Sequence, residues 1–213
     1  MKRVFYYDFK GKKLLFFGTI KGLVSEREKL KKLYENFQAE AIFLGISPEQ
    51  LKGLEEYLKE PFEIEPEDYE VIYALKLEEY GEVGLPVPTY LEAFAISRRD
   101  GVELLPLDIP EEEFSELFVK TIDIFHILHY NFRKRKIWRK KFQADTQEEF
   151  VLMWDREINK IKPYYTIELK REEYMSRKIK ELMNEKDYGR ILIIIELERL
   201  YGVLKNLNLL QTT

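Results

Sequence analysis

The chain has 213 residues, of which 45% are hydrophobic and 35% are charged, and its formal net charge at pH 7 is −4. A chain of this length and hydrophobic content can bury one well-packed core, so we expect a single domain over residues 1–213. Because the sequence has no cysteine, disulfides, thiolate zinc sites and cysteine nucleophiles are excluded, and this composition is typical of a reducing, cytoplasmic compartment.

The first part of the chain predicts a β-hairpin, a helix and a short strand. Residues 3–9 and 13–17 are strand-like and are separated by a Lys-Gly turn signal, which favours a hairpin. Ser25 and Glu28 then have the spacing of a capping box, which predicts the start of a helix. Residues 41–44 are all apolar, as expected for a strand that is covered on both faces.

The middle of the chain predicts further alternation of helices and strands. Ser47 and Gln50 predict a second capped helix, with proline at its first position. Residues 71–75 favour a strand, whereas the glycines and prolines of residues 81–88 break both regular periods and predict a loop. Residues 90–99 have the apolar spacing of a short helix.

The last part of the chain completes an α/β pattern. After a strand at residues 102–107, Pro110 and three glutamates open a long helix whose apolar positions continue toward Trp138. The remaining predicted elements are a helix that is capped by Thr146 and ends at Ile161, a helix over residues 167–184 and a buried strand over residues 190–195. Together these elements predict a central mixed sheet flanked by helices, an N-terminal β-hairpin and a helical portion over about residues 110–161.

Four strand-like runs stop abruptly at polar residues. The endings are Thr19-Ile20-Lys21, Ile46-Ser47-Pro48, Asp108-Ile109-Pro110 and Glu196-Leu197-Glu198-Arg199. In α/β proteins the ends of buried strands are where ligands and catalytic groups usually lie. Because no ending supplies a histidine or a cysteine, the sequence predicts the place of a site without naming its chemistry.

The order of these motifs resembles the TraB-like group, which is related to ChaN, Tiki and erythromycin-esterase-like proteins. That family has Gly-Thr-x-His after its hairpin, and this chain has Gly18-Thr19-Ile20-Lys21 there. The family's Arg-Asp-x-Tyr-Met helix is matched by residues 171–175, and its Gly-x-Gly-His-x-x-Gly by residues 196–202. The resemblance covers almost the whole chain and implies one TraB-like domain.

The departures from this family favour a non-catalytic protein. Relatives that resemble metal-dependent hydrolases use two histidines and a glutamate at the sheet edge, and the matching positions here are Lys21, Arg199 and Gly45. An ammonium or a guanidinium group cannot donate a lone pair to a metal, and glycine has no side chain. The resemblance therefore implies a pseudoenzyme without a metal site, and no Walker loop or Gly-x-Gly-x-x-Gly motif indicates a nucleotide cofactor.

The replaced positions suggest an anionic ligand instead. Lys21 and Arg199 are expected at neighbouring strand ends, with Thr19 and Glu198 beside them and helix N-termini close by. Fixed cations and helix N-termini both favour anions. The alternative is that both cations are ordinary solvated side chains paired with nearby glutamates such as Glu49.

Arg171 and Asp108 are the candidates for a remaining catalytic role. Both occupy positions that match polar residues of the family, so a divergent hydrolase could use them with a carboxylate such as Glu49 or Glu198. The alternative is that Arg171 pairs with a glutamate of its own helix, Glu168 or Glu172. No serine lies in Gly-x-Ser-x-Gly, so the sequence does not predict a serine hydrolase.

The two histidines lie close together in the sequence. His126 and His129 are expected on one helical face with Asp123, a spacing that could place two ligands on a metal. No second cluster supplies more imidazole, so a packing or hydrogen-bonding role is favoured.

Residues 133–141 form a basic strip in which seven of nine side chains are cationic. Its members are Arg133, Lys134, Arg135, Lys136, Trp138, Arg139, Lys140 and Lys141, together with Ile137. A basic strip with aromatic residues can bind nucleic acid. The acidic net charge argues against that role, and Glu148, Glu149 and Asp155 are nearby candidates for counter-charges, so a solvated helix end is favoured.

The favoured function is therefore a binding or regulatory module for a small anionic ligand or a protein partner. Residues 114–138 offer enough apolar surface to predict a homodimer through the helical portion. No apolar stretch approaches the roughly 18 to 20 residues that cross a bilayer, so no membrane partner is expected. The abundance of lysine and glutamate is typical of heat-adapted proteins with surface ion-pair networks.

Overall fold

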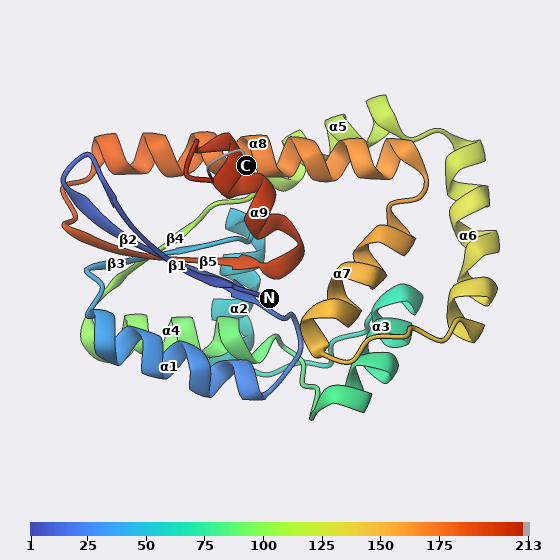
Figure 1. The fold of residues 1–213 in the computed structure, drawn as a ribbon, viewed down its shortest axis with the longest axis horizontal. Coiled ribbons are helices and arrows are strands. Elements are labelled where there is room, and N and C mark those ends of the chain that lie inside the picture. The colour runs from blue at the N-terminus through green and yellow to red at the C-terminus, as the bar shows by residue number, and fades with distance from the viewer. Residues whose placement is uncertain (211–213) are drawn as a thin grey trace.

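The computed structural model describes residues 1–210 as a central sheet between two layers of helices (Figure 1). The strands lie in the order β1 (Val4–Phe9), β2 (Lys12–Thr19), β5 (Arg190–Glu196), β3 (Ala41–Leu44) and β4 (Glu103–Pro106). The hairpin strand β1 pairs antiparallel with β2, whereas β2, β5, β3 and β4 are parallel to one another. The predicted mixed sheet with an N-terminal hairpin is confirmed.

Alternate strand residues enter two separate cores. On one face the buried strand residues include Phe16 and Ile193, which pack against α8 (Lys162–Glu185) and α9 (Leu197–Asn206). On the other face Phe17 and Ile194 pack against α1 (Ser25–Phe37) and α4 (Pro88–Asp100). Because helices cover both faces, the central strands can be apolar at every position, as the sequence predicts.

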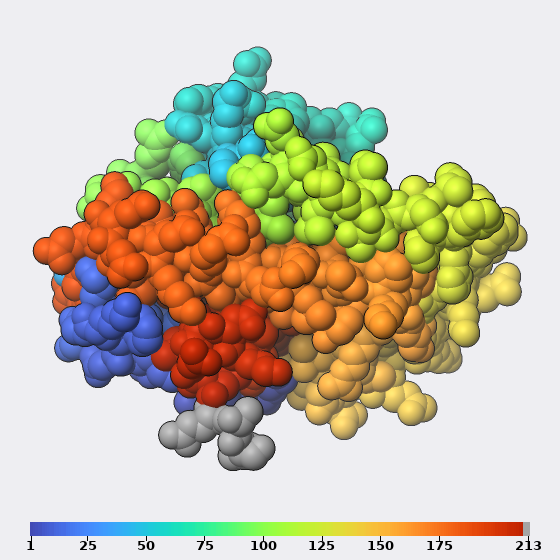
Figure 2. Space-filling view, turned by 90° about the horizontal axis from the view of Figure 1, so that it is seen from above, coloured from blue at the N-terminus to red at the C-terminus, as the bar shows by residue number. Residues whose placement is uncertain are grey.

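The parallel strands place their carboxyl ends at one edge of the sheet, and helices surround that edge. The elements there are α2 (Pro48–Lys59), α3 (Asp68–Leu77), the 3-10 helix η1 (Glu78–Tyr80), α5 (Glu111–Thr121), α6 (Ile124–Arg139) and α7 (Gln147–Ile158). Helices α3, α6 and α7 lie beyond the edge, on the right of Figure 1, and α5 runs beside α8 (Figures 1 and 2). No helix within residues 1–210 is both long and apolar enough to cross a membrane.

Residues 71–75 are helical, so the predicted strand there is wrong. They belong to α3, which buries Tyr69, Ile72 and Leu77, a spacing that puts all three on one helical face. The Glu70 side chain accepts from the backbone amide of Glu67 and closes the first turn. The apolar run at residues 71–75 is too short for its periodicity to distinguish a helix from a strand.

The predicted long helix from Pro110 toward Trp138 is two helices. Helix α5 ends at Thr121, and the side chain of Asp123 accepts a hydrogen bond from the backbone amide of His126 (2.9 Å) to start α6. Apolar residues continue across the break, so the periodicity concealed the new N-cap. Because of this break, α5 runs beside α8, whereas α6 turns away from α8 and lies beside α3 (Figure 1).

Other differences concern helix ends near the sheet. Ser25 is the first residue of α1 and makes no side-chain cap, so the predicted Ser25–Glu28 capping box is wrong. Pro163 lies in the first turn of α8, which therefore starts before the predicted residue 167. Helix α9 was not expected, because Gly202 falls in its middle and the strand before it leads into it without a loop.

Candidate ligand-binding site

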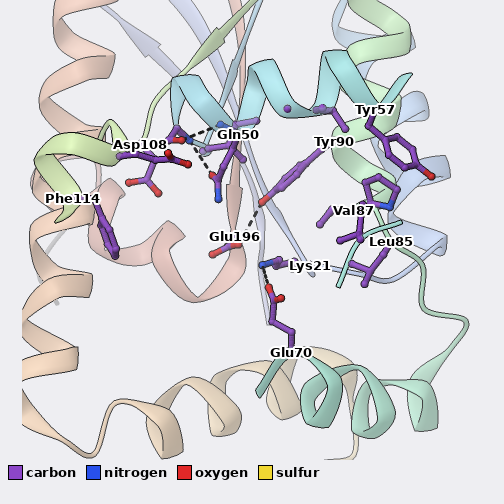
Figure 3. Close-up of a pocket in the computed structure, with 18 of the residues that line it drawn as sticks. Lys21, Gln50, Tyr57, Glu70, Leu85, Val87, Tyr90, Asp108, Phe114 and Glu196 are labelled. Carbon is purple, nitrogen blue, oxygen red and sulfur yellow. Dashed lines mark hydrogen bonds and ion pairs between the residues drawn. The ribbon is translucent and has the colours of Figure 1, made fainter. Parts of the chain in front are cut away.

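A cavity of about 670 Å³ opens at the carboxyl edge of β3, β4 and β5 (Figure 3). This volume is within the range of small-molecule sites. The apolar side chains of its wall include Ile46, Leu54, Tyr57, Phe62, Ile64, Leu85, Val87, Ile109 and Phe114. The polar side chains that line it are Lys21, Ser47, Gln50, Glu70, Tyr90, Asp108, Glu111, Arg171 and Glu196.

The predicted capping box of α2 shapes one side of the cavity. The Ser47 hydroxyl accepts from the backbone amide of Gln50 and the Gln50 side chain accepts from the amide of Ser47, both at 3.1 Å. The Glu49 carboxylate accepts from the backbone amide of Glu111 (3.1 Å) and so links the starts of α2 and α5. These contacts hold both helix N-termini at the rim of the cavity and occupy amides that an anion would otherwise bind.

Lys21 follows β2 and lies among carboxylates. Its ammonium group donates to Glu70 (3.1 Å), and its side chain keeps 37% exposure. Burial opposes its charge, but Glu196, Glu70 and Glu198 outweigh burial and raise the pKa of Lys21. Lys21 is therefore a charged group whose partner comes from α3, an element that the sequence did not place there.

Arg171 and Asp108, the two catalytic candidates, form an ion pair in the cavity. The Arg171 guanidinium donates through Nε to Asp108 Oδ2 (2.9 Å) and through a second nitrogen to Glu168 (2.9 Å). Asp108 Oδ1 also accepts from the backbone amide of Ile109 (2.8 Å). Arg171 therefore pairs with Glu168 of its own helix, which was one of the two alternatives, and also with Asp108 at the end of β4.

Glu196, Tyr90 and Glu198 lie together at the end of β5. The Tyr90 hydroxyl donates to Glu196 over a long 3.4 Å, as Figure 3 shows. Behind them Glu198 Oε2 is buried and has no hydrogen-bond partner among the described residues. Burial first, and then the charge of Glu196, raise the pKa of Glu198 to about 8. Burial and these two carboxylates also hold the pKa of Tyr90 well above its usual value.

Arg199 lies outside the cavity lining, in a cluster of carboxylates on the α7–α8 side. Its side chain is 3% exposed and pairs with Asp155, with Glu172 (3.2 Å) and with Glu168 (3.5 Å). Burial raises the pKa of Glu172 to about 7, although Arg199 opposes this rise. Arg199 is the third residue of α9, and none of its three carboxylate partners lines the cavity.

The four residues expected to bind an anion are therefore divided. Lys21 lines the cavity, Glu198 lies behind it, and Arg199 lies in its own cluster. Thr19 is fully buried, and its hydroxyl lies 2.8 Å from that of Thr89, which links β2 to α4. The structure does not bring Lys21 and Arg199 to one ligand position.

Three of the seven cations of the basic strip hold α6 in place. Arg133 donates to Glu157 (2.8 Å), Lys140 pairs with the same carboxylate, and Lys134 donates to Asp68 (2.6 Å). The expected counter-charges were wrong: Glu148 pairs with Arg3, Asp155 with Arg199, and Glu149 accepts from the amide of Asp145.

The rest of the strip faces outward. Arg135, Lys136, Trp138, Arg139 and Lys141 are exposed. Arg135, Lys136 and Arg139 line an open groove with Phe132 and Lys160. His126 serves in the cap of α6, with its Nδ1 2.8 Å from Asp123 Oδ1, and His129 is exposed. Within residues 1–210, no three His, Cys, Asp or Glu side chains are arranged to hold a metal ion.

Several lining residues carried no signal in the sequence. Glu70 reaches the cavity only because α3 is a helix, and Tyr90 reaches it from α4. Phe62 and Ile64 come from the irregular segment between α2 and α3, which has no periodic pattern. Only the polar ending of β5 marked Glu196. A scan of protein-family models and a search of curated proteins found no match to this chain.

Proposed function

We propose that this chain is a non-catalytic, TraB-like binding or regulatory module whose small ligand binds in the carboxyl-edge cavity. The observation that carries the proposal is the cavity of about 670 Å³, which has an apolar wall and a polar floor of mutually paired charges. Sites of this volume and lining at the ends of parallel strands are typical ligand sites of α/β folds.

The state of the candidate catalytic groups supports a binding role. Arg171 and Asp108 neutralise each other, and Glu49 accepts from the amide of Glu111. Arg199, at a position where the resembling family has histidine, is enclosed by three carboxylates. Elemental analysis of the purified protein, with melts in zinc, manganese, cobalt or EDTA, tests this part of the proposal. A stoichiometric metal would favour the divergent hydrolase instead.

A cavity-filling substitution tests ligand binding itself. Gly53 lines the cavity on α2, and a Cβ atom there would meet nothing within 4 Å. Gly53→Phe therefore fills part of the cavity, and Gly53→Ala is the matched control that leaves it open. A fragment screen read by melting temperature and ligand-observed NMR should give binders that Gly53→Phe abolishes and Gly53→Ala retains. Binders that are indifferent to both substitutions would place the ligand elsewhere.

Nucleic-acid binding is a second candidate, favoured by the open groove of the basic strip. Arg135, Lys136 and Arg139 line it, and its one carboxylate, Glu157, is already engaged by other cations. These three cations have no ion pair within residues 1–210, and three phosphate contacts predict weak binding with a salt slope of about −2 to −3. Anisotropy of labelled RNA and DNA at low salt tests it, with charge reversal of these three residues as the variant. A homodimer through α5 and α6 is compatible with either function.

A further inference from the structure

Carboxylates outnumber cations in the cavity. Two cationic side chains line it, Lys21 and Arg171. The acidic side chains in the lining are Glu70, Asp108, Glu111 and Glu196. Both cations are already committed, because Lys21 donates to Glu70 and Arg171 donates to Asp108 and Glu168. An anionic ligand would have to displace these partners and enter a site with an excess of negative charge.

The N-termini of α2 and α5 at the rim of the cavity also provide little binding capacity for an anion. The first-turn amide of Gln50 is bonded to Ser47, and that of Glu111 is bonded to Glu49. Backbone amides that attract anions in other helices are occupied here by the chain's own side chains.

The end of β5, in contrast, has hydrogen-bond acceptors without adequate donors. Glu196 lines the cavity and accepts only the long contact from Tyr90 among the described residues. Glu198 Oε2 is buried behind it with no partner in the same range. Burial and the charge of Glu196 raise the pKa of Glu198, although Arg199 opposes this rise.

The cavity wall suits the body of an organic molecule. Tyr57 and Phe62 form an aromatic pair whose ring centroids are 5.5 Å apart, and Leu85 and Val87 continue the apolar surface. Figure 3 shows Tyr57, Leu85 and Val87 on one side of the cavity, with Glu196 between them and Phe114. Aromatic walls beside carboxylates are a common arrangement for binding organic cations.

We propose that the ligand of this cavity is an organic cation, an amine with an apolar body, whose ammonium group donates to Glu196. The apolar body packs against Tyr57, Phe62 and Leu85. This inference rests on the proposed binding function, and it identifies the charge and shape of the ligand. It replaces the anionic ligand that the sequence alone suggested.

Three probes of matched length and different charge test the inference. They are 4-phenylbutylamine, 4-phenylbutanol and 4-phenylbutyrate, titrated by calorimetry into the full chain. We expect the amine to bind at least about tenfold more tightly than the carboxylate, because a charge-assisted hydrogen bond contributes about 1.5–3 kcal/mol and 1.4 kcal/mol is tenfold. Glu196→Gln should remove this preference, whereas Glu111→Gln at the exposed rim should retain most of it.

Lys21→Met separates the two charge models most sharply. If an anion bound at Lys21, the substitution would abolish binding, whereas an amine that binds Glu196 should bind as tightly or more tightly once a like charge is removed. If 4-phenylbutyrate binds the wild-type protein as tightly as 4-phenylbutylamine or more tightly, the cation inference is overturned, but the cavity remains a binding site. Failure of all three probes to bind, together with a fragment screen without hits, overturns both. Melts without probe confirm that each variant folds.

Discussion

Two glycines in helices have opposite surroundings, and substitution should distinguish them. A Cβ atom at Gly202 in α9 would lie 1.9 Å from Glu172 Oε2, whereas at Gly53 in α2 it would meet nothing within 4 Å. Glu172 is buried and bonded to Arg199, so its carboxylate cannot move away freely. We expect Gly202→Ala to lower the free energy of unfolding by about 1–3 kcal/mol.

Gly53→Ala is the control for this change. Alanine loses less conformational freedom than glycine in a helix, so the substitution should raise the free energy of unfolding by about 0.5–1 kcal/mol. Urea denaturation of both variants measures the difference. If both substitutions changed the free energy of unfolding equally, the position of the Glu172 carboxylate would not require a glycine at residue 202.

The buried carboxyl of Glu198 should make stability depend on pH. Its pKa is about 8 in the folded protein and about 4.5 in the unfolded chain, so the folded state binds the proton more tightly. This contribution is fully present below about pH 4.5 and is lost as pH rises through about 8. Because Gln mimics the protonated acid, Glu198→Gln should gain melting temperature relative to the wild-type protein between pH 5 and pH 9.

Thermal melts across that range check the prediction. Glu63→Gln, on the exposed segment before α3, removes the same charge without a buried site and serves as control. If the difference in melting temperature between Glu198→Gln and the wild-type protein stayed constant with pH, Glu198 would be ionised and well solvated in the folded state.

At the scale of single residues, the sequence located the site better than it described it. The polar strand endings correctly drew attention to Lys21, Asp108 and Glu196, all of which line the cavity. The ion-pair partners of these residues could not be predicted from local sequence. Asp108 and Arg171 are 63 residues apart, and Lys21 and Glu70 are 49 residues apart. Arg199 lies in α9, a helix that no local pattern predicted, and pairs with carboxylates of α7 and α8 outside the cavity lining.

At the scale of elements, a single carboxylate fixes α6 against α7. Glu157 is buried at the end of α7 and receives Arg133 and Lys140 from the basic strip and Lys160 from its own end. These cations outweigh the effect of burial and lower the pKa of Glu157 to about 2. We expect Glu157→Gln to lower the free energy of unfolding by about 1.5–3 kcal/mol at pH 7, because the neutral amide keeps only one acceptor oxygen and turns a donor toward the cations.

Glu116→Gln provides the comparison for this element. Glu116 pairs with Lys120 one turn away on the exposed face of α5, and such pairs contribute about 0.5 kcal/mol or less. Urea denaturation gives both values, and hydrogen exchange should show faster opening of α6 only in Glu157→Gln. An equal, small effect of both substitutions would mean that apolar packing alone holds α6.

Element types followed from the sequence where caps, turns or an unbroken apolar run marked them, and failed where tertiary contacts decided. The hairpin, the capped helix α2 and the buried strands were expected within one or two residues. The run at residues 71–75 was too short to separate a helix from a strand, and its helical form depends on Tyr69, which packs on Tyr130 with ring centroids 4.1 Å apart. Such contacts join residues that are 61 positions apart.

At the scale of the whole molecule, the outward face of α6 is apolar and unpartnered within residues 1–210. Phe125 and Phe132 are 75% and 78% exposed, and Leu128 lies between them on the same face. Ile124 at the start of α6 and Val119 near the end of α5 are also exposed, and Figure 2 shows this part of the chain protruding at one end of the molecule. Side chains of this size present on the order of 500 Å² of apolar surface, which usually marks an interaction site.

The arrangement of charge along α6 favours a second copy of this chain as the partner. The apolar turns are followed on the same face by Arg135, Lys136 and Arg139, and Asp123 stands before them. In an antiparallel, two-fold pair of α6 helices, Leu128 meets the second copy's Phe132. The basic end of each helix then reaches the other's Phe125 and Asp123, which gives cation–π and ionic contacts twice over.

We therefore expect a homodimer that substitutions on α6 dissociate. Leu128→Glu with Phe132→Glu should give a monomer by light scattering and sedimentation at tens of micromolar protein, because four carboxylates would meet in the apolar middle of the interface. Leu58→Glu with Leu75→Glu, which alters two similarly exposed leucines on α2 and α3, should leave the dimer intact. A wild-type protein that sediments as a monomer at these concentrations would contradict the prediction. Since the carboxyl-edge cavity is lined by other elements, probe binding should survive in the monomeric variant, so the two surfaces can be assigned independently.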